Sequence, residues 1–255
     1  MISVDRVYQK VLAIANKEQR GYITPQEFNL FADHAQLEIF EQYFYDLNQF
    51  NRMHGNSMGH SDMKDILESK ISHFEVWART PNAEFQNEFG DLNLEQFEDF
   101  YRLIEVRVNY ADKTGYHVAE EMTTREFRKY ENSPLTRRST TRPSYIHFHD
   151  GYNRIKIHPF PPKNTYIVQG VASDDIRISY IKKPKKPNWT YIVSSNQTAL
   201  YNPTAIDAQD FGLHPSDEPE LVYRILALAG IAMQRPEITQ TAGALEAGKI
   251  QQEKR

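Results

Sequence analysis

The pattern of hydrophobic and polar positions predicts a helical N-terminal region. Apolar residues recur at helical spacing from Val4 to Ala15. A second helix is predicted to begin at 24–27, where Thr24 and Glu27 can form a capping box. A third helix is expected over 61–74, after a polar loop at 51–59. The side chains expected to face the core are Val4, Val7, Tyr8, Val11, Leu12, Ala15, Phe28, Phe31, Ala35, Ile39, Tyr43, Ile66, Leu67 and Ile71.

The middle of the chain alternates between apolar and polar residues, as a β-strand with one buried face does. In the first such strand, the apolar positions from Ile104 to Tyr110 are expected to share the buried face. A turn at 113–115 returns the chain, and a short helix capped by Thr123 and Glu126 follows. Further strands are expected at 145–149, 154–158, 166–171, 176–181 and 189–193, the first two joined in a hairpin by Asp150 and Gly151.

The C-terminal region returns to helical spacing. The acidic, proline-containing stretch 216–219 predicts a helix start. After Pro236 the chain is poor in large apolar residues, and Gly243 and Gly248 weaken any helix there. We therefore predict an α+β fold with a helical region at 1–90, a β-rich core at 91–205, and a C-terminal helix with an extended tail at 206–255. The buried face of this last helix is expected to comprise Leu221, Val222, Ile225, Leu226 and Ala229.

Composition narrows the classes of protein. The chain is 40% hydrophobic and 25% charged, which is typical of a globular protein with a core. A net charge of −4 excludes a strongly basic protein that wraps nucleic acid. The absence of cysteine excludes disulfides and thiolate chemistry. Because the N-terminus lacks a signal-peptide core and the longest apolar run, 225–233, is too short to cross a bilayer, we expect a soluble protein made in the cytoplasm.

The stretch 16–27 has the spacing of a calcium-binding loop between two helices. Gly21 stands at the sixth position and Glu27 at the twelfth. However, Arg20 occupies a ligand position, and a cation there repels calcium. We interpret this stretch as a plain helix–turn–helix.

Three histidines, His147, His149 and His158, are expected on the polar face of the hairpin, an arrangement that suggests zinc. A four-residue loop would place Arg154 opposite His149 and Lys156 opposite His147, and two cations among the ligands disfavour a metal. We interpret this face as exposed to solvent or to a partner. No nucleophile, phosphate-loop or zinc-protease motif is present, so we predict no enzyme activity, no catalytic residues, no cofactor and no metal.

A basic run at 182–187 contains four lysines and two prolines. It would suit contact with DNA phosphates. We favour a solvated strand end, because lysine and proline keep strand edges from pairing.

Several segments resemble head-to-tail adaptor proteins of tailed phages, a family that includes the tail tubular protein A type of short-tailed phages and the ring proteins of crAss-like phages. The segments that resemble the β core of these adaptors are 133–136, 141–146, 155–161 and 176–184. The stretch 11–44 and the stretch from 220–226 to 251–253 are similar to uncharacterised phage virion proteins. The resemblance covers most of the chain and contains no catalytic signature.

The resemblance implies a structural virion protein of the neck or tail, a subunit of the ring that links portal to tail. Its expected partners are the portal protein, other ring or hub proteins, further copies of itself in a ring of about twelve, and passing genomic DNA without sequence specificity, with no membrane partner. In such adaptors the C-terminus grips the portal. Ile238, Leu245 and Ile250 are spaced by seven and five, which is compatible with a thin apolar stripe on a helix laid in a groove, and Gln251 and Gln252 can hydrogen-bond at its rim. These five are the expected partner-binding residues, and by resemblance the groove is expected to belong to portal subunits or to a neighbouring ring subunit.

Two other functions compete with the connector. A tail-tip or host-surface binding module would also suit the β region and the 15 tyrosines. A phage nuclease or other enzyme is disfavoured by the missing motifs. A connector subunit would form oligomers or bind portal, whereas a receptor module would bind glycan or cell surface.

Overall fold

The chain folds into two compact units, one formed by Met1–Phe74 together with Pro184–Arg255, the other by Glu75–Lys183. The structure is a computed structural model. It describes residues 1–15, 23–52, 58–80, 91–97, 99–110, 115–131, 133, 135–149, 153–159, 175–194, 199–232, 240 and 242–248.

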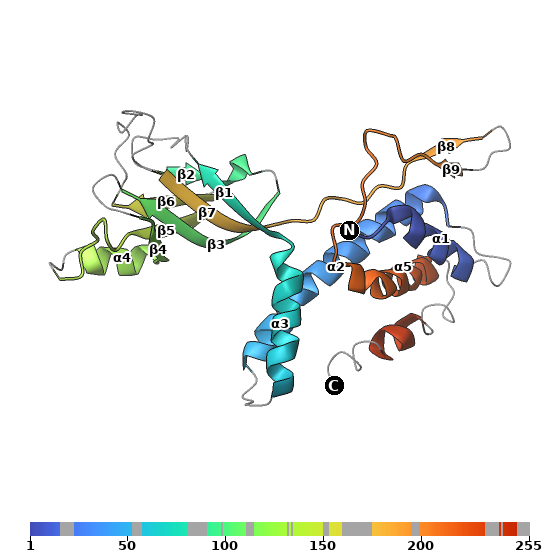
Figure 1. Cartoon of the computed structure of the whole chain (residues 1–255), viewed down its shortest axis with the longest axis horizontal. Coiled ribbons are helices and arrows are strands. Elements are labelled where there is room, and N and C mark those ends of the chain that lie inside the picture. The colour runs from blue at the N-terminus through green and yellow to red at the C-terminus, as the bar shows by residue number, and fades with distance from the viewer. Residues whose placement is uncertain are drawn as a thin grey trace. The chain divides into compact units, whose positions relative to one another are not determined.

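The first unit is mainly helical (Figure 1). Helices α1 and α2 both pack against α5, although α5 follows them by some 170 residues or more. Within the described residues, no helix has the length and hydrophobicity needed to cross a membrane. The elements are α1 (Val4–Ala15), α2 (Pro25–Arg52), α3 (Met58–Ser72), the strands β8 (Tyr191–Val193) and β9 (Ala199–Tyr201), the 3-10 helix η3 (Pro215–Asp217) and α5 (Glu218–Ala232), with a further helix at 242–248.

Helical spacing predicted the packing of α1 and α5 correctly. Every expected inward residue of α1 is buried except Leu12, which is partly exposed. All five expected inward residues of α5 are buried. In α2 the expected stripe is buried except for Phe31, which is partly exposed, and the buried face also includes Gln36 and Phe40.

The capping box at the start of α2 forms as predicted. The backbone N–H and the hydroxyl of Thr24 donate to the carboxylate of Glu27 at 3.0 and 2.7 Å, and the N–H of Glu27 donates back to the hydroxyl at 3.3 Å. These hydrogen bonds from Thr24 favour the charged carboxylate and lower the pKa of Glu27. Thr123 and Glu126 form the same box at the start of α4 (Thr124–Glu131), also as predicted.

The second unit contains a seven-stranded mixed sheet in the order β1–β7–β3–β4–β5–β6–β2 (Figure 1). Neighbouring strands are antiparallel except for the parallel pair β4–β5. Its elements, besides α4, are β1 (Glu75–Thr80), β2 (Asp91–Asn93), the 3-10 helix η2 (Leu94–Gln96), β3 (Phe100–Asn109), β4 (His117–Glu121), β5 (Ser144–His149), β6 (Asn153–His158) and β7 (Asp175–Lys182).

One face of this sheet encloses the core of the second unit, because alternate side chains of each strand point to the same side. The buried cluster consists of Leu92, Leu94, Val106, Val108, Tyr110, Ala119, Tyr145, Ile155, Ile157, Ile176, Ile178 and Tyr180.

The turn before β4 uses a glycine. Gly115 has a φ of +98°, a backbone conformation that residues with a Cβ rarely adopt.

The structure confirms the α+β fold class and corrects its segmentation. Strand β1 at 75–80 lies in the region 1–90 that was predicted to be helical. It forms because all six of its residues pair with β7, about a hundred positions away. The hairpin of β8 and β9 lies in the expected β-rich core at 91–205, yet it forms a separate two-stranded sheet in the first unit. The predicted strand at 166–171 lies outside the described residues.

Three further predictions were wrong in detail. The expected loop at 51–59 is shorter, because α2 runs to Arg52 and α3 begins at Met58. Ile66 is 51% exposed, whereas its neighbour Leu67 is buried. Ile104 is 45% exposed because the register of β3 against β7 shifts between Leu103 and Glu105, which turns Ile104 away from the face that holds Val106.

Candidate functional site

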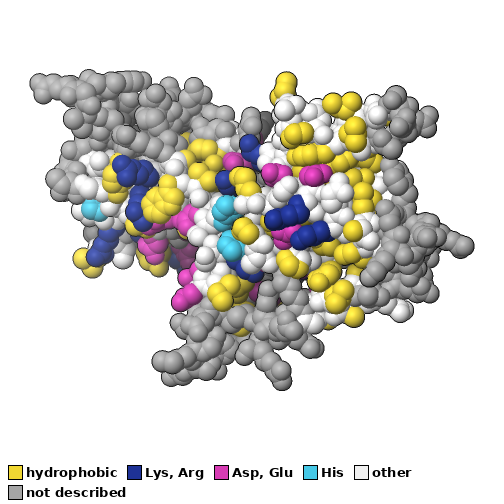
Figure 2. All heavy atoms as spheres, turned by 45° about the vertical axis from the view of Figure 1, so that its right-hand side comes forward, with side chains coloured by type: hydrophobic (Ala, Val, Ile, Leu, Met, Phe, Trp, Pro, Cys, Tyr) yellow, Lys and Arg dark blue, Asp and Glu magenta, His cyan; other side chains and the backbone are white. Residues whose placement is uncertain are grey.

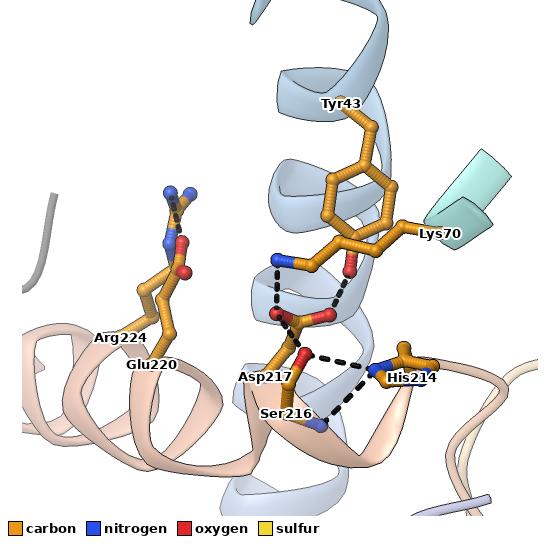
Figure 3. A network of polar contacts seen from close by, with 7 residues as sticks. All are labelled: Tyr43, Lys70, His214, Ser216, Asp217, Glu220 and Arg224. Carbon is orange, nitrogen blue, oxygen red and sulfur yellow. Dashed lines mark hydrogen bonds and ion pairs between the residues drawn. The ribbon is translucent and has the colours of Figure 1, made fainter. Parts of the chain in front are cut away.

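The first unit contains a buried charged cluster where η3 leads into α5 (Figure 3). Asp217, on η3, has no exposed surface. Its Oδ1 accepts from Lys70 Nζ of α3 at 2.8 Å and from Ser216 Oγ at 3.2 Å. Its Oδ2 accepts from the hydroxyl of Tyr43 on α2. One carboxylate therefore connects three segments that are far apart in sequence.

This geometry suits a structural role for Asp217. A general base has to come within about 2.6–3.2 Å of the proton that it removes. Here donors of the protein itself already contact both carboxylate oxygens, and neither Asp217 nor Lys70 is more than 8% exposed. The cluster therefore holds η3 against α2 and α3.

The sequence pattern did not reveal this cluster. The stretch 216–219 was interpreted only as an acidic helix start, and Lys70 lies 147 positions away from Asp217. A weak signal was present, because Lys70 adjoins Ile71 on the side of α3 that was predicted to face inward.

Ion pairs also fix α5 along its length. Near its start, Glu218 accepts from Lys10 of α1 at 2.6 Å and from Arg6. One turn further on, Arg224 pairs with Glu220 at 2.9 Å (Figure 3). Arg224 also contacts Glu246, in the helix 242–248, at 3.1 Å. These contacts join α5 to both the N-terminal and the C-terminal part of its unit.

The β8–β9 hairpin stands on an aromatic base. Trp189 is 2% exposed, and its ring stacks on those of Tyr191 and Tyr201, each at 5.8 Å between ring centres. The indole Nε1 donates to Asp5 of α1 at 2.9 Å, and the backbone N–H donates to Asn29 of α2 at 2.8 Å. Trp189 therefore attaches the hairpin to both helices.

Both strands of the hairpin carry apolar side chains that are exposed. Ile192 and Leu200 pair across the two strands and are 58% and 57% exposed, and Val193 is 62% exposed. We call these three residues the hairpin surface. Figure 2 shows hydrophobic side chains at the surface of this unit around the position of the hairpin, at the upper right of the view. An isolated two-stranded hairpin is marginally stable in water, so this one needs its anchor at Trp189. Exposed apolar side chains on an anchored hairpin are typical of a surface that contacts another protein.

The base of the hairpin also affects the chemistry of Tyr201. Burial raises the pKa of this hydroxyl, and the nearby carboxylates of Asp210 and Asp5 raise it further. The phenol of Tyr201 therefore stays neutral over the pH range in which proteins normally work.

Most of the predicted partner-binding residues, Ile238, Ile250, Gln251 and Gln252, lie outside the described residues. Leu245 lies in the helix 242–248 and is 48% exposed. In the same helix, Ala242 is buried and Glu246 pairs with Arg224. This part of the tail is therefore helical and packs on its own chain, which corrects the expectation of an extended tail.

The structure changes the predicted pairing of the histidine hairpin. His149 pairs with Asn153 and His147 with Ile155, so the loop comprises 150–152 and is one residue shorter than expected. The predicted pairing of His149 with Arg154 and of His147 with Lys156 is therefore wrong.

The three histidines do not share a face. His158 pairs with Ser144, one residue out of step with the positions of His147 and His149, and side chains alternate along a strand. The ring of His158 packs against that of Phe127 at 4.3 Å. Throughout the described part of the chain, no group of three or more His, Asp or Glu side chains is placed to hold a metal ion.

Two sequence candidates remain, the calcium-like loop and the basic run. Residues 16–22 of the calcium-like loop lie outside the described residues. In the basic run, Lys183, Lys185 and Lys186 are exposed, and the backbone carbonyl of Lys185 accepts from Gln36 at 2.9 Å.

Comparison with known proteins adds no identification. No protein-family model matches the chain, and no curated protein matches it. The function has to be argued from the residues.

Proposed function

We propose that this protein is a structural subunit of the head-to-tail connector of a tailed phage, which joins the portal to the tail. The observation that carries the proposal is the hairpin surface. Ile192, Val193 and Leu200 are each more than half exposed, on a hairpin whose base is fixed by Trp189. A fixed, apolar and protruding element suits permanent contact with another protein.

The position of the adaptor-like segments supports the same proposal. Those at 141–146, 155–161 and 176–184 include parts of strands β5, β6 and β7, which belong to one sheet. The virion-protein-like segments at 11–44 and 220–226 include parts of α1, α2 and α5, which pack together in the first unit. The resemblance therefore follows the division of the chain into two units.

In the proposed connector, the hairpin surface contacts a neighbouring copy or the portal. Closed rings require two different patches to meet between neighbours. The hairpin surface supplies one patch, and the tail that includes Leu245 supplies contact with the portal. By resemblance, the ring contains about twelve copies.

The experiment compares the wild type with the double variant I192S/L200S. Burying an aliphatic side chain contributes about 1.5–3 kcal/mol, so losing two should weaken assembly at least tenfold. Ring formation is followed by light scattering and negative-stain imaging, and binding to the portal protein of the same phage by pull-down. The matched control is L135S, because Leu135 is also an exposed leucine, at 93%, but lies in the second unit.

The outcome decides between the function classes. We expect rings or portal complexes with the wild type and L135S, and their loss with I192S/L200S while the helical content stays the same. A wild-type protein that remains monomeric and ignores portal would contradict the proposal. Binding to host cells or glycans instead would support the receptor module.

A further inference from the structure

One end of the sheet in the second unit is a strand whose edge lacks the usual protection against pairing with another chain. Among the described strands, β1 pairs only with β7, and it does so through all six of its residues in one regular register. Its sequence contains no proline or lysine, the residues that commonly block an edge strand. At the other end of the sheet, β2 has only three residues, and so short an edge offers little to pair with.

The two faces of β1 differ in chemistry. Val76 and Ala78 pack against the core of the second unit. Because side chains alternate along a strand, positions 75, 77 and 79 belong to the opposite, outer face. These positions carry glutamate, tryptophan and arginine in that order. Trp77, at the centre, is 60% exposed.

This order of residues is complementary to itself when two β1 strands run antiparallel. If Trp77 of one copy lies opposite Trp77 of a second copy, position 75 of each lies opposite position 79 of the other, since both are two residues from Trp77. A glutamate then stands opposite an arginine at both ends of the pairing. Directly opposite residues share a face, where aromatic pairs and opposite charges stabilise antiparallel strands.

The same register also suits the core face. It places Val76 of each copy opposite Ala78 of the other, so the apolar layer continues from one sheet into the next. Trp77 is oriented before any partner arrives, because Arg107 of β3 lies over its ring at 5.0 Å. A large aromatic side chain that is already oriented loses less entropy on binding.

We propose that two copies of this protein pair edge to edge through β1, antiparallel and centred on Trp77, so that their two sheets join into one. The complementary charges of positions 75 and 79 favour a second copy over a segment of another protein as the occupant of this edge. The contact is isologous, because the same patch is used on both copies. A connector ring requires two different patches, so this contact is distinct from the ring contact and does not depend on the connector role.

The test reverses the charges at the ends of the pairing in the full-length protein. E75R leaves only basic residues at positions 75 and 79, and R79E leaves only acidic ones, so like charges oppose each other in both homodimers. Each variant should weaken dimerisation at least about tenfold, measured by analytical ultracentrifugation. An equimolar mixture of the two variants should form a mixed dimer, and E75R/R79E should dimerise like the wild type.

Cysteine cross-linking tests the register, because the chain has no cysteine of its own. Oxidised W77C should form a disulfide-linked dimer, since the Cα atoms of directly opposite residues are about 4.5–5.5 Å apart. T80C is the matched control. Position 80 and its counterpart would be six residues apart along the paired strands, or about 20 Å, so T80C should stay unlinked.

Two further controls separate this contact from other effects. E131R reverses an exposed glutamate on α4 in the same unit and should dimerise like the wild type. Repeating the series in the I192S/L200S background removes the proposed ring contact, so that pairing through β1 is measured alone. The Tm of each variant distinguishes lost pairing from lost folding.

The outcomes decide the proposal without the portal. A wild type that stays monomeric in the I192S/L200S background would overturn it, and so would a dimer that E75R and R79E leave intact. Failure of E75R/R79E to restore pairing, or cross-linking of T80C as readily as W77C, would show that the register is wrong. None of these results bears on ring formation or portal binding, so the connector proposal stands or fails separately.

Discussion

At the scale of single residues, Asp217 shows how a charge is accommodated in the interior of the first unit. Removing a carboxylate from water is costly unless a cation and further donors meet it. Lys70 supplies the cation, while Tyr43 and Ser216 supply hydroxyl donors. The ammonium of Lys70 also lies 5.6 Å from the centre of the Tyr43 ring. The carboxylate of Asp217 and its three donors therefore depend on one another to remain stable in the interior.

We expect D217N to destabilise the protein by about 3–5 kcal/mol, because it leaves Lys70 buried without its carboxylate. The double variant K70M/D217N should cost less than the sum of the two single changes, because no unpaired charge remains. Urea unfolding followed by circular dichroism measures both. The control E68Q removes a carboxylate from the exposed pair Lys64–Glu68 on α3, the helix that contains Lys70, and should have little effect on stability. A D217N protein as stable as the wild type would contradict this account.

At the scale of elements, Gln36 connects α2 to two stretches of irregular chain. It is fully buried, and its Nε2 donates to the carbonyl of Lys185 at 2.9 Å. Its Oε1 accepts from the backbone N–H of Gly212 at 2.9 Å. A Cβ at position 212 would lie 3.3 Å from the Cβ of Pro184, so the two stretches also pack tightly against each other. The side-chain amide of Gln36 thus hydrogen-bonds two backbone groups that lie outside any helix or sheet.

We expect Q36L to destabilise the protein by about 2–4 kcal/mol. Leucine matches the size of glutamine but leaves the partly buried carbonyl of Lys185 and N–H of Gly212 unpaired, at about 1–2 kcal/mol each. Chemical denaturation gives the free energy of unfolding, and hydrogen exchange at Gly212 should accelerate. Gln49 is exposed on the same helix, so Q49L is the control and should change stability little. Slow exchange at Gly212 in Q36L would show that another group satisfies this N–H.

At the scale of the whole molecule, the C-terminal tail packs on its own unit and, in the proposed connector, also contacts the portal. Within the described residues, Glu246 contacts Arg224 of α5 and Ala242 is buried, so part of the tail belongs to the first unit. Leu245 is 48% exposed on the same helix and can contact a partner. Under the connector proposal, stability and assembly are coupled through this short segment.

We expect deletion of residues 236–255 to leave a folded protein with a lower Tm, because Arg224 loses the carboxylate of Glu246. The deletion should also weaken binding to portal by well over tenfold, if Ile238, Leu245 and Ile250 are buried against the portal and each contributes about 1–2 kcal/mol. The variant L245S separates the effects, since it should weaken portal binding and keep the Tm of the wild type. Calorimetry and pull-down are the measurements. Full portal binding by the truncated protein would eliminate this role for the tail.

The sequence by itself determined the features that depend on neighbours within a few residues. The capping boxes at Thr24 and Thr123 formed as predicted, because each closes over three positions. The buried faces of α1 and α5 followed helical spacing, and alternation located most strands of the sheet. Local pattern was also enough for the α+β fold class, because that class depends on which elements form.

Only the tertiary structure decided what depends on pairing between distant residues. The partners of Asp217 come from positions 43 and 70, and β1 exists through its pairing with β7. The register of β7 against β1 and β3 decided which of its residues face the core, and a slip of one residue would have put Arg177 there in place of Ile176 and Ile178. Register depends on how whole strands pack and on loop length, as the three-residue loop at 150–152 shows. For this reason the sequence predicted the elements, whereas their side-chain partnerships emerged only from the fold.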